Sequence, residues 1–186
     1  MQEQIKQGYR LSPQQEYLWL LQGGPSASQY RVMCAIKIEG ELRKDILIAA
    51  LTNIIERHEI LRTSFRTLPG MTIPLQVIGS TPSMTLHERD LTGFDFHAQE
   101  AELESLWDRV RTENFDLEQE APLHAHLVAK SAHECALILV LPALCGDMAT
   151  LKNIVSELAL SYRAAMRREE RATDPLQYIV VSEWQP

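Results

Sequence analysis

The chain has 186 residues, of which 45% are hydrophobic and 23% are charged, as in ordinary soluble globular proteins. This length suits one domain with a substantial core, so we expect residues 1–186 to form a single domain. The 25 acidic and 18 basic residues give a net charge of −7 without a basic patch, which argues against a nucleic-acid-binding protein.

The first half of the chain alternates between helical and strand patterns. A helix is predicted from Ser12, a residue type that caps helices, to Leu21. A loop at 23–26 and a strand at 30–38 follow. Residues 42–58 carry apolar side chains at helical spacing, and 62–66 have the pattern of a short strand.

The second half continues the alternation. Strands are predicted at 73–78 and 85–89, and a helix at 96–113. Residues 123–129 and 135–141 predict a hairpin that turns near 131–133. A long amphipathic helix is predicted at 147–168, and the charged run 167–171 is expected to be its solvated end.

Strands interleaved with helices predict an α/β fold, which we expect to be a two-layer sandwich with helices packed on a mixed sheet. The helices at 42–58 and 147–168 each have an apolar face for this packing.

No targeting or membrane segment is predicted. The N-terminus lacks the basic and then apolar pattern of a secretory signal. The apolar run 135–145 contains Pro142 and is too short to cross a bilayer. Three cysteines without paired spacing are expected to be reduced, with Cys135 and Cys145 in the core. We therefore expect a cytoplasmic protein.

The most informative segment is the junction of residues 137–150, where a buried strand runs through a loop into a helix. Strand ends hold side chains rigidly and often carry active sites. Here Pro142 and Ala143 offer no acid, base or nucleophile. Asp147 is the only ionisable group of the loop, and Cys145 is its only soft ligand.

A second segment, residues 57–65, reads Arg-His-Glu-Ile-Leu-Arg-Thr-Ser-Phe. Together the two segments resemble the condensation domains of nonribosomal peptide synthetases, whose Arg-His-Glu-x-Leu-Arg-Thr-x-Phe motif is matched at every fixed position. Weaker matches lie at residues 11–20, 115–123 and 176–185, so the resemblance covers nearly the whole chain.

The resemblance also exposes a departure. The family carries a His-His-x-x-x-Asp-Gly active-site motif at the end of an apolar strand. On that motif Pro142 and Ala143 replace the two histidines, Asp147 is kept, and Met148 replaces the glycine. The family's catalytic residues are therefore expected to be absent, although its scaffold is kept.

The resemblance implies one lobe, the N-terminal one, of a chloramphenicol acetyltransferase-like fold. Two such lobes enclose a tunnel, into which carrier proteins deliver phosphopantetheine-bound acyl and aminoacyl thioesters for amide-bond formation. The implied partners are the carrier proteins and the C-terminal lobe of the same synthetase, and no cofactor is expected on the chain itself. The chain alone is expected to be inactive. The alternative is a non-catalytic docking module for carrier proteins or tailoring enzymes.

Four residues are expected to be structural. Arg57 and His58 end a helix, and the resemblance implies capping or packing there, although His58 could serve as a base in another context. Arg62 opens a strand and is the best candidate for a buried ion pair with Asp147. The competing interpretation is that Asp147 only caps the helix that follows.

Two further candidates are weighed against site chemistry. His124 and His126 share one strand face, but no third ligand follows at a telling spacing, so we expect exposed histidines and no metal site. Cys145 lies before a helix, yet no nearby histidine is available to activate it, so a nucleophilic role is not favoured.

Overall fold

The computed structural model describes residues 8–23, 30–167 and 177–179. Its α-helices and strands agree with the predicted bounds to within two residues, and a short 3-10 helix was not predicted. Residues 24–26 of the predicted 23–26 loop and the charged run beyond Arg167 lie outside the described residues. The elements are α1 (Pro13–Leu21), β1 (Arg31–Glu39), α2 (Lys44–Arg57), the 3-10 helix η1 (Glu59–Arg62), β2 (Thr63–Arg66), β3 (Leu75–Ile78), β4 (Thr85–Asp90), α3 (Phe96–Thr112), β5 (His124–Ser131), β6 (Glu134–Pro142) and α4 (Met148–Arg167).

The larger sheet among the described residues has the strand order β1-β6-β5-β4. Strand β6 is antiparallel to both of its neighbours, whereas β4 and β5 run parallel and are connected through α3. The β1–β6 ladder is long and regular, from Arg31 opposite Pro142 to Glu39 opposite Glu134. Strands β2 and β3 form a separate antiparallel pair. The predicted mixed sheet and the 123–141 hairpin are therefore confirmed.

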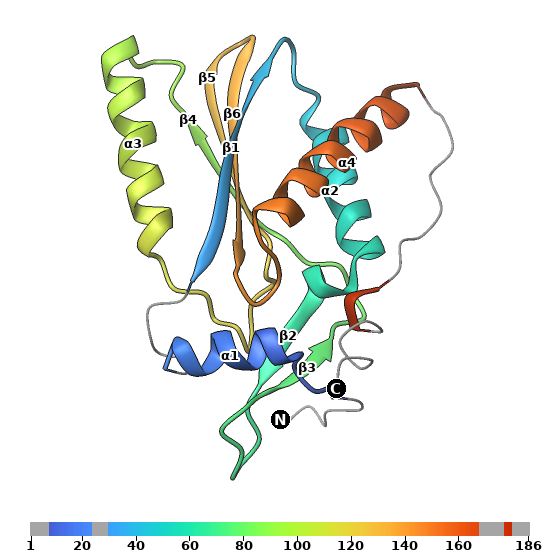
Figure 1. The fold of residues 1–186 in the computed structure, drawn as a ribbon. Coiled ribbons are helices and arrows are strands. Elements are labelled where there is room, and N and C mark those ends of the chain that lie inside the picture. The colour runs from blue at the N-terminus through green and yellow to red at the C-terminus, as the bar shows by residue number, and fades with distance from the viewer. Residues whose placement is uncertain (1–7, 24–29, 168–176, 180–186) are drawn as a thin grey trace.

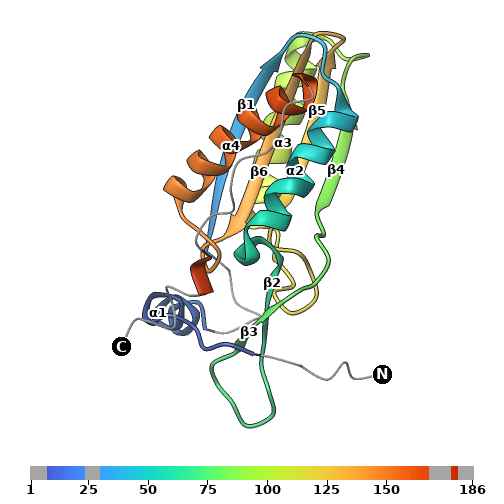
Figure 2. The ribbon, with the colours of Figure 1, turned by 90° about the vertical axis from the view of Figure 1, so that its right-hand side faces the viewer.

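Helices cover both faces of the larger sheet. Helices α2 and α4 lie on one face and α3 lies on the other (Figures 1 and 2). The predicted α/β class with helices packed on a mixed sheet is confirmed, including the packing of α2 and α4. The structure refines the expected two layers, because α3 adds a third.

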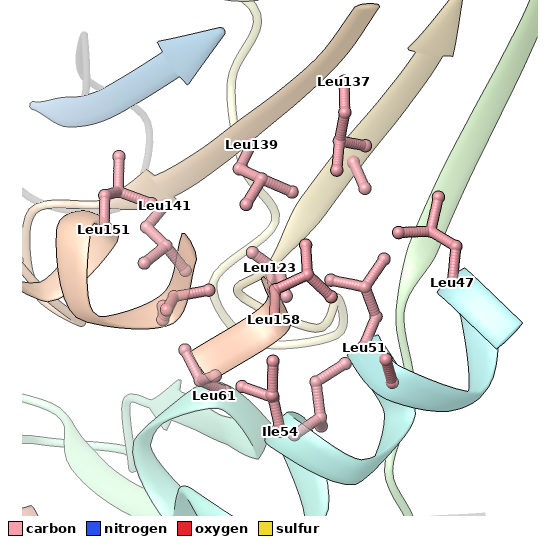
Figure 3. Packing of buried hydrophobic residues seen from close by; sticks show 14 of the residues in the cluster. Leu47, Leu51, Ile54, Leu61, Leu123, Leu137, Leu139, Leu141, Leu151 and Leu158 are labelled. Atoms are coloured by element: carbon pink, nitrogen blue, oxygen red, sulfur yellow. The ribbon is translucent and has the colours of Figure 1, made fainter. Parts of the chain in front are cut away.

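Each face of the sheet has its own hydrophobic core. Figure 3 shows the first core, in which leucines of β6 meet the apolar sides of α2 and α4. The second core lies under α3 and extends to Trp19 of α1. Because β5 and β6 are buried on both faces, their sequences are nearly continuous apolar runs. Burial of each leucine contributes about 1.5–3 kcal/mol to stability.

Helix α1 and the β2–β3 pair lie at one end of the larger sheet (Figure 1). Ser12 caps α1 in a capping box with Gln15, whose side chain accepts the Ser12 N–H at 2.9 Å. The buried Gln15 amide then donates to Gln76 Oε1 of β3 at 3.2 Å and to Leu144 O at 2.9 Å. These bonds fix the end of the sheet where β6 leads into α4.

Candidate functional site

The junction between β6 and α4 is held from several sides. The Ala143 N–H donates to Tyr30 O at 2.8 Å, and the Cys145 N–H donates to Pro142 O at 2.9 Å. A glycine is required at position 146 for steric reasons, because a Cβ there would lie 2.7 Å from Cγ2 of Thr150. The absence of a side chain lets the first turn of α4 approach the loop closely.

A pocket of about 590 Å³ opens at this junction. Helix α4 contributes a polar side to it, α1 and the end of α2 form further walls, and residues 177 and 178 complete the lining. The lining side chains that carry the argument below are His58, Ala143, Cys145, Asp147, Glu157 and Tyr178.

Asp147 caps the N-terminus of α4. Its Oδ1 accepts the Thr150 N–H at 2.8 Å and the Thr150 hydroxyl at 3.0 Å. These hydrogen bonds hold the pKa of the Asp147 carboxyl below its usual value. The side chain is exposed at the pocket rather than buried.

The predicted Arg62–Asp147 ion pair is wrong. The Arg62 guanidinium donates to Gly79 O, and its Nη2 lies 3.4 Å from Glu59 Oε1, one turn earlier in η1. Asp147 instead takes the local partner three residues along the chain. Each charge is thus satisfied within its own element or by the adjoining loop.

Arg57 and His58 meet Glu157 of α4. The Arg57 guanidinium pairs with Glu157 Oε1, and His58 Nε2 lies 2.6 Å from Oε2 of the same carboxylate. Burial and then the neighbouring Arg57 charge lower the pKa of His58 even with this carboxylate in contact. At neutral pH the uncharged ring therefore donates its Nε2–H to Glu157, which joins the end of α2 to α4.

Residues 177–179 close one side of the pocket. The Gln177 side chain accepts the Glu59 N–H at 3.0 Å and donates to Arg57 O at 2.8 Å. The Tyr178 hydroxyl lies 2.8 Å from Ser12 Oγ. The remainder of the 176–185 motif lies outside the described residues.

Cys145 does not have the environment of a nucleophile. The residue is 5% exposed, and burial raises the pKa of its thiol. A thiol needs a lowered pKa to be reactive at neutral pH. Cys34 and Cys135 are also free thiols, but they are only partly buried, so Cys135 lies at the margin of the first core rather than within it.

The predicted exposure of His124 and His126 is wrong. Their exposed fractions are 8% and 6%, because α3 and the segment that follows it cover this face of β5. The part of the chain that the structure describes contains no group of three or more His, Cys, Asp or Glu side chains able to hold a metal ion. Within the same residues, no helix is long and apolar enough to cross a membrane.

The sequence analysis missed Glu157 and the Gln15–Gln76 pair. Glu157 lies in the middle of an amphipathic helix, and only its place on the polar side of α4 hints at a role. Gln15 was recoverable as the third residue after the capping Ser12, a capping-box spacing. Nothing in the sequence marks Gln76 as its partner.

The sequence profile described as "Condensation domain" matches residues 5–186. Chondramide synthase of Chondromyces crocatus is 34% identical over 178 residues, which are 94% of this chain and 4% of that synthase. The solved starter condensation domain of rhizomide synthetase matches 96% of this chain and 44% of its own, with a TM-score of 0.80 at 23% identity.

A third similar structure is the complex of the X-domain and OxyB from teicoplanin biosynthesis. It matches 99% of this chain and 38% of its own, with a TM-score of 0.77 at 24% identity. The chain belongs to the condensation domain family of nonribosomal peptide synthetases, whose general role is amide-bond formation. Its chloramphenicol acetyltransferase-like fold is also confirmed. The chain spans a small part of the synthase and less than half of each solved chain.

Proposed function

We propose that the chain is the N-terminal lobe of a nonribosomal peptide synthetase condensation domain, and that it does not catalyse condensation by itself. One observation carries the proposal. The junction pocket is built and braced, yet Pro142 and Ala143, at the end of β6, present no ionisable side chain to it.

The chemistry explains why this matters. Amide formation joins an amine nitrogen to a thioester carbonyl, breaks the carbon–sulfur bond and releases a thiol. The amine must lose a proton, and a base or a precisely placed hydrogen-bond acceptor assists that step. The methyl group of Ala143 can do neither. Asp147 is engaged as a helix cap, and the pKa of its carboxyl is lowered, which makes it a weaker base.

The proposed partners are carrier proteins, whose phosphopantetheine arms bring donor and acceptor as thioesters, and the C-terminal lobe of the same synthetase. The resemblance in the motifs supports this assignment, as does the match to 44% of the length of the solved starter condensation domain. The cytoplasm remains the proposed location.

Intact-protein mass spectrometry tests the catalytic part. Loaded donor and acceptor carrier proteins are mixed with the chain, and transfer to the acceptor is followed. We expect no product above uncatalysed aminolysis, whereas a two-lobe condensation domain with both motif histidines should condense its own carrier pair. Turnover by the chain would contradict the proposal. In a full-length parent, Pro142→His with Ala143→His tests whether the missing imidazoles alone limit the reaction.

The second candidate is a non-catalytic docking module. It is favoured by the intact pocket framework, which has no base at positions 142 and 143, and by the similarity in fold to the X-domain that was solved with OxyB. Calorimetric titration with a carrier protein bearing a stable pantetheine amide distinguishes the two. Binding without turnover in the full-length parent, even after both histidines are restored, supports a docking module.

A further inference from the structure

Three histidines gather on the sheet face under α3, outside the lining of the junction pocket. His87 of β4 is the direct neighbour of His126 on β5, and their rings stack with centroids 4.7 Å apart and planes 21° apart. The His124 ring lies 4.5 Å from the ring of Phe115, in the segment that follows α3. His87 is exposed and covers the buried ring of His126.

The two β5 histidines lack hydrogen bonds at Nε2. Neither atom has a hydrogen-bond partner within the described structure, and Glu120 Oε2, 3.6 Å from His124 Nε2, is within ion-pair distance of a protonated His124 only. The gap that both rings line with Glu113 and Phe115 has no room for a water molecule. Such a site tolerates neutral imidazoles at some cost, but an uncompensated cation there is far more costly.

The surrounding charges mostly oppose protonation of His126, whereas the carboxylates near His124 favour its protonation. Arg109 of α3 faces His126, and Arg31 of β1 lines the same gap, where its guanidinium stacks 5.4 Å from the centre of the Phe115 ring. The facing carboxylates are Glu113 and Glu120, at the two ends of the segment after α3. Burial and the neighbouring His87 lower the pKa of His126 to about 4, and burial also lowers that of His124.

We propose that the three histidines form an acid-sensitive switch, in which protonation of His126 releases the 113–117 segment from the sheet. A proton reaches His126 from the neighbouring cleft of about 250 Å³ that His87, Arg109 and Glu113 line. The segment must then move to admit water or to bring a carboxylate to the new cation.

Release would be transmitted beyond the histidines. Leu117 O accepts the Phe65 N–H at 2.8 Å, so the segment anchors β2. Strand β2 directly follows η1, whose Ile60 and Leu61 line the junction pocket. Opening of the segment therefore loosens a wall of the pocket while β1 and β6 stay paired.

The direction with pH follows from the lowered pKa of each histidine. Above about pH 6.5, the pKa of an unperturbed histidine, the rings are neutral in both the closed and the open form, and the closed form is fully stable. As the pH falls toward about 4, the open form binds protons preferentially and the closed form is lost.

Hydrogen exchange of the full chain, expressed as protection factors to remove the intrinsic pH dependence, tests the switch between pH 7.0 and 4.5. We expect protection of the Phe65 amide to fall at least tenfold, while the Leu139 amide of β6 changes little. His126→Phe together with His124→Phe should abolish the loss. His133→Gln, at the exposed hairpin turn, is the matched control and should keep it.

Histidine side-chain NMR gives an independent readout. His124 and His126 should titrate below the ordinary histidine pKa near 6.5. Normal titration of both β5 histidines would overturn the switch, as would equal protection of Phe65 at the two pH values. If the double variant misfolds, His126→Gln is used, and a pH response identical to that of the unmodified chain also overturns it.

Discussion

Asp147 shows how a local hydrogen bond prevails over a distant ion pair. A cap requires only that Asp147 and Thr150 adopt the first turn of α4, which the helix forms in any case. An ion pair with Arg62 would have to desolvate two charges that already have partners near them. The cap was the competing interpretation of the sequence, and the structure confirms it through the Asp-x-x-Thr spacing.

Asp147→Ala should lower the free energy of unfolding by about 1 kcal/mol, the usual value of a helix cap. Asp147→Asn keeps an acceptor oxygen and should lose less. Arg62→Ala combined with Asp147→Ala should be additive, because the two side chains share no contact. Urea denaturation of the unmodified chain, both Asp147 variants, Arg62→Ala and the double variant measures this, and clear non-additivity would support the ion pair instead.

His124 and His126 mark a limit of sequence analysis at the same scale. Alternation along a strand predicts that the two residues share a face, and they do. It does not say whether that face is covered, because the covering elements, α3 and the Phe115 segment, come from outside the hairpin. Because histidine is a polar residue type, the sequence favoured exposure, whereas the tertiary structure buries both side chains.

At the scale of elements, the sequence predicted nearly every boundary. The 3.6-residue period of apolar side chains identifies α4, and the strand pattern identifies the β5–β6 hairpin. Each pattern is visible because the buried side of an element is encoded in its own residues. The junction pocket was predicted only as a strand end. Its other walls come from α1, from His58 with η1, and from residues 177–178, and no local pattern brings these together.

The contact between α2 and α4 depends on Glu157. Glu157→Ala removes the carboxylate that Arg57 and His58 share, and their side chains are only 19% and 27% exposed. We expect a loss of about 1–3 kcal/mol, since these largely buried donors lose the hydrogen bonds to that carboxylate. Glu157→Gln should lose less. Thermal denaturation measures both, with Glu104→Ala on the exposed side of α3 as the control. An equal effect of Glu157→Ala and Glu104→Ala would show that the cluster adds no stability.

At the scale of the whole molecule, the chain consists of a covered sheet and a smaller end formed by α1 and β2–β3 (Figure 1). The apolar cores account for the covered sheet, and the second core reaches Trp19 and Phe65 at the small end. The polar link between the two parts is specific. Gln15, only 2% exposed, contacts both β3 and the β6–α4 junction.

Gln15→Ala should therefore destabilise the chain far more than a helix surface change. The variant leaves Leu144 O and Gln76 Oε1 without their donor, and each unsatisfied buried acceptor costs about 1–3 kcal/mol. Gln14→Ala, at the adjacent exposed position of α1, should change the free energy of unfolding by less than about 0.5 kcal/mol. Guanidinium denaturation provides both values. Fluorescence reports on Trp19, whose indole N–H donates to Thr72 O of the β2–β3 connection at 3.0 Å. Matching midpoints for the two variants would mean that apolar packing alone joins the small end to the sheet. A lower midpoint for Gln15→Ala only would show that the junction pocket depends on this buried amide.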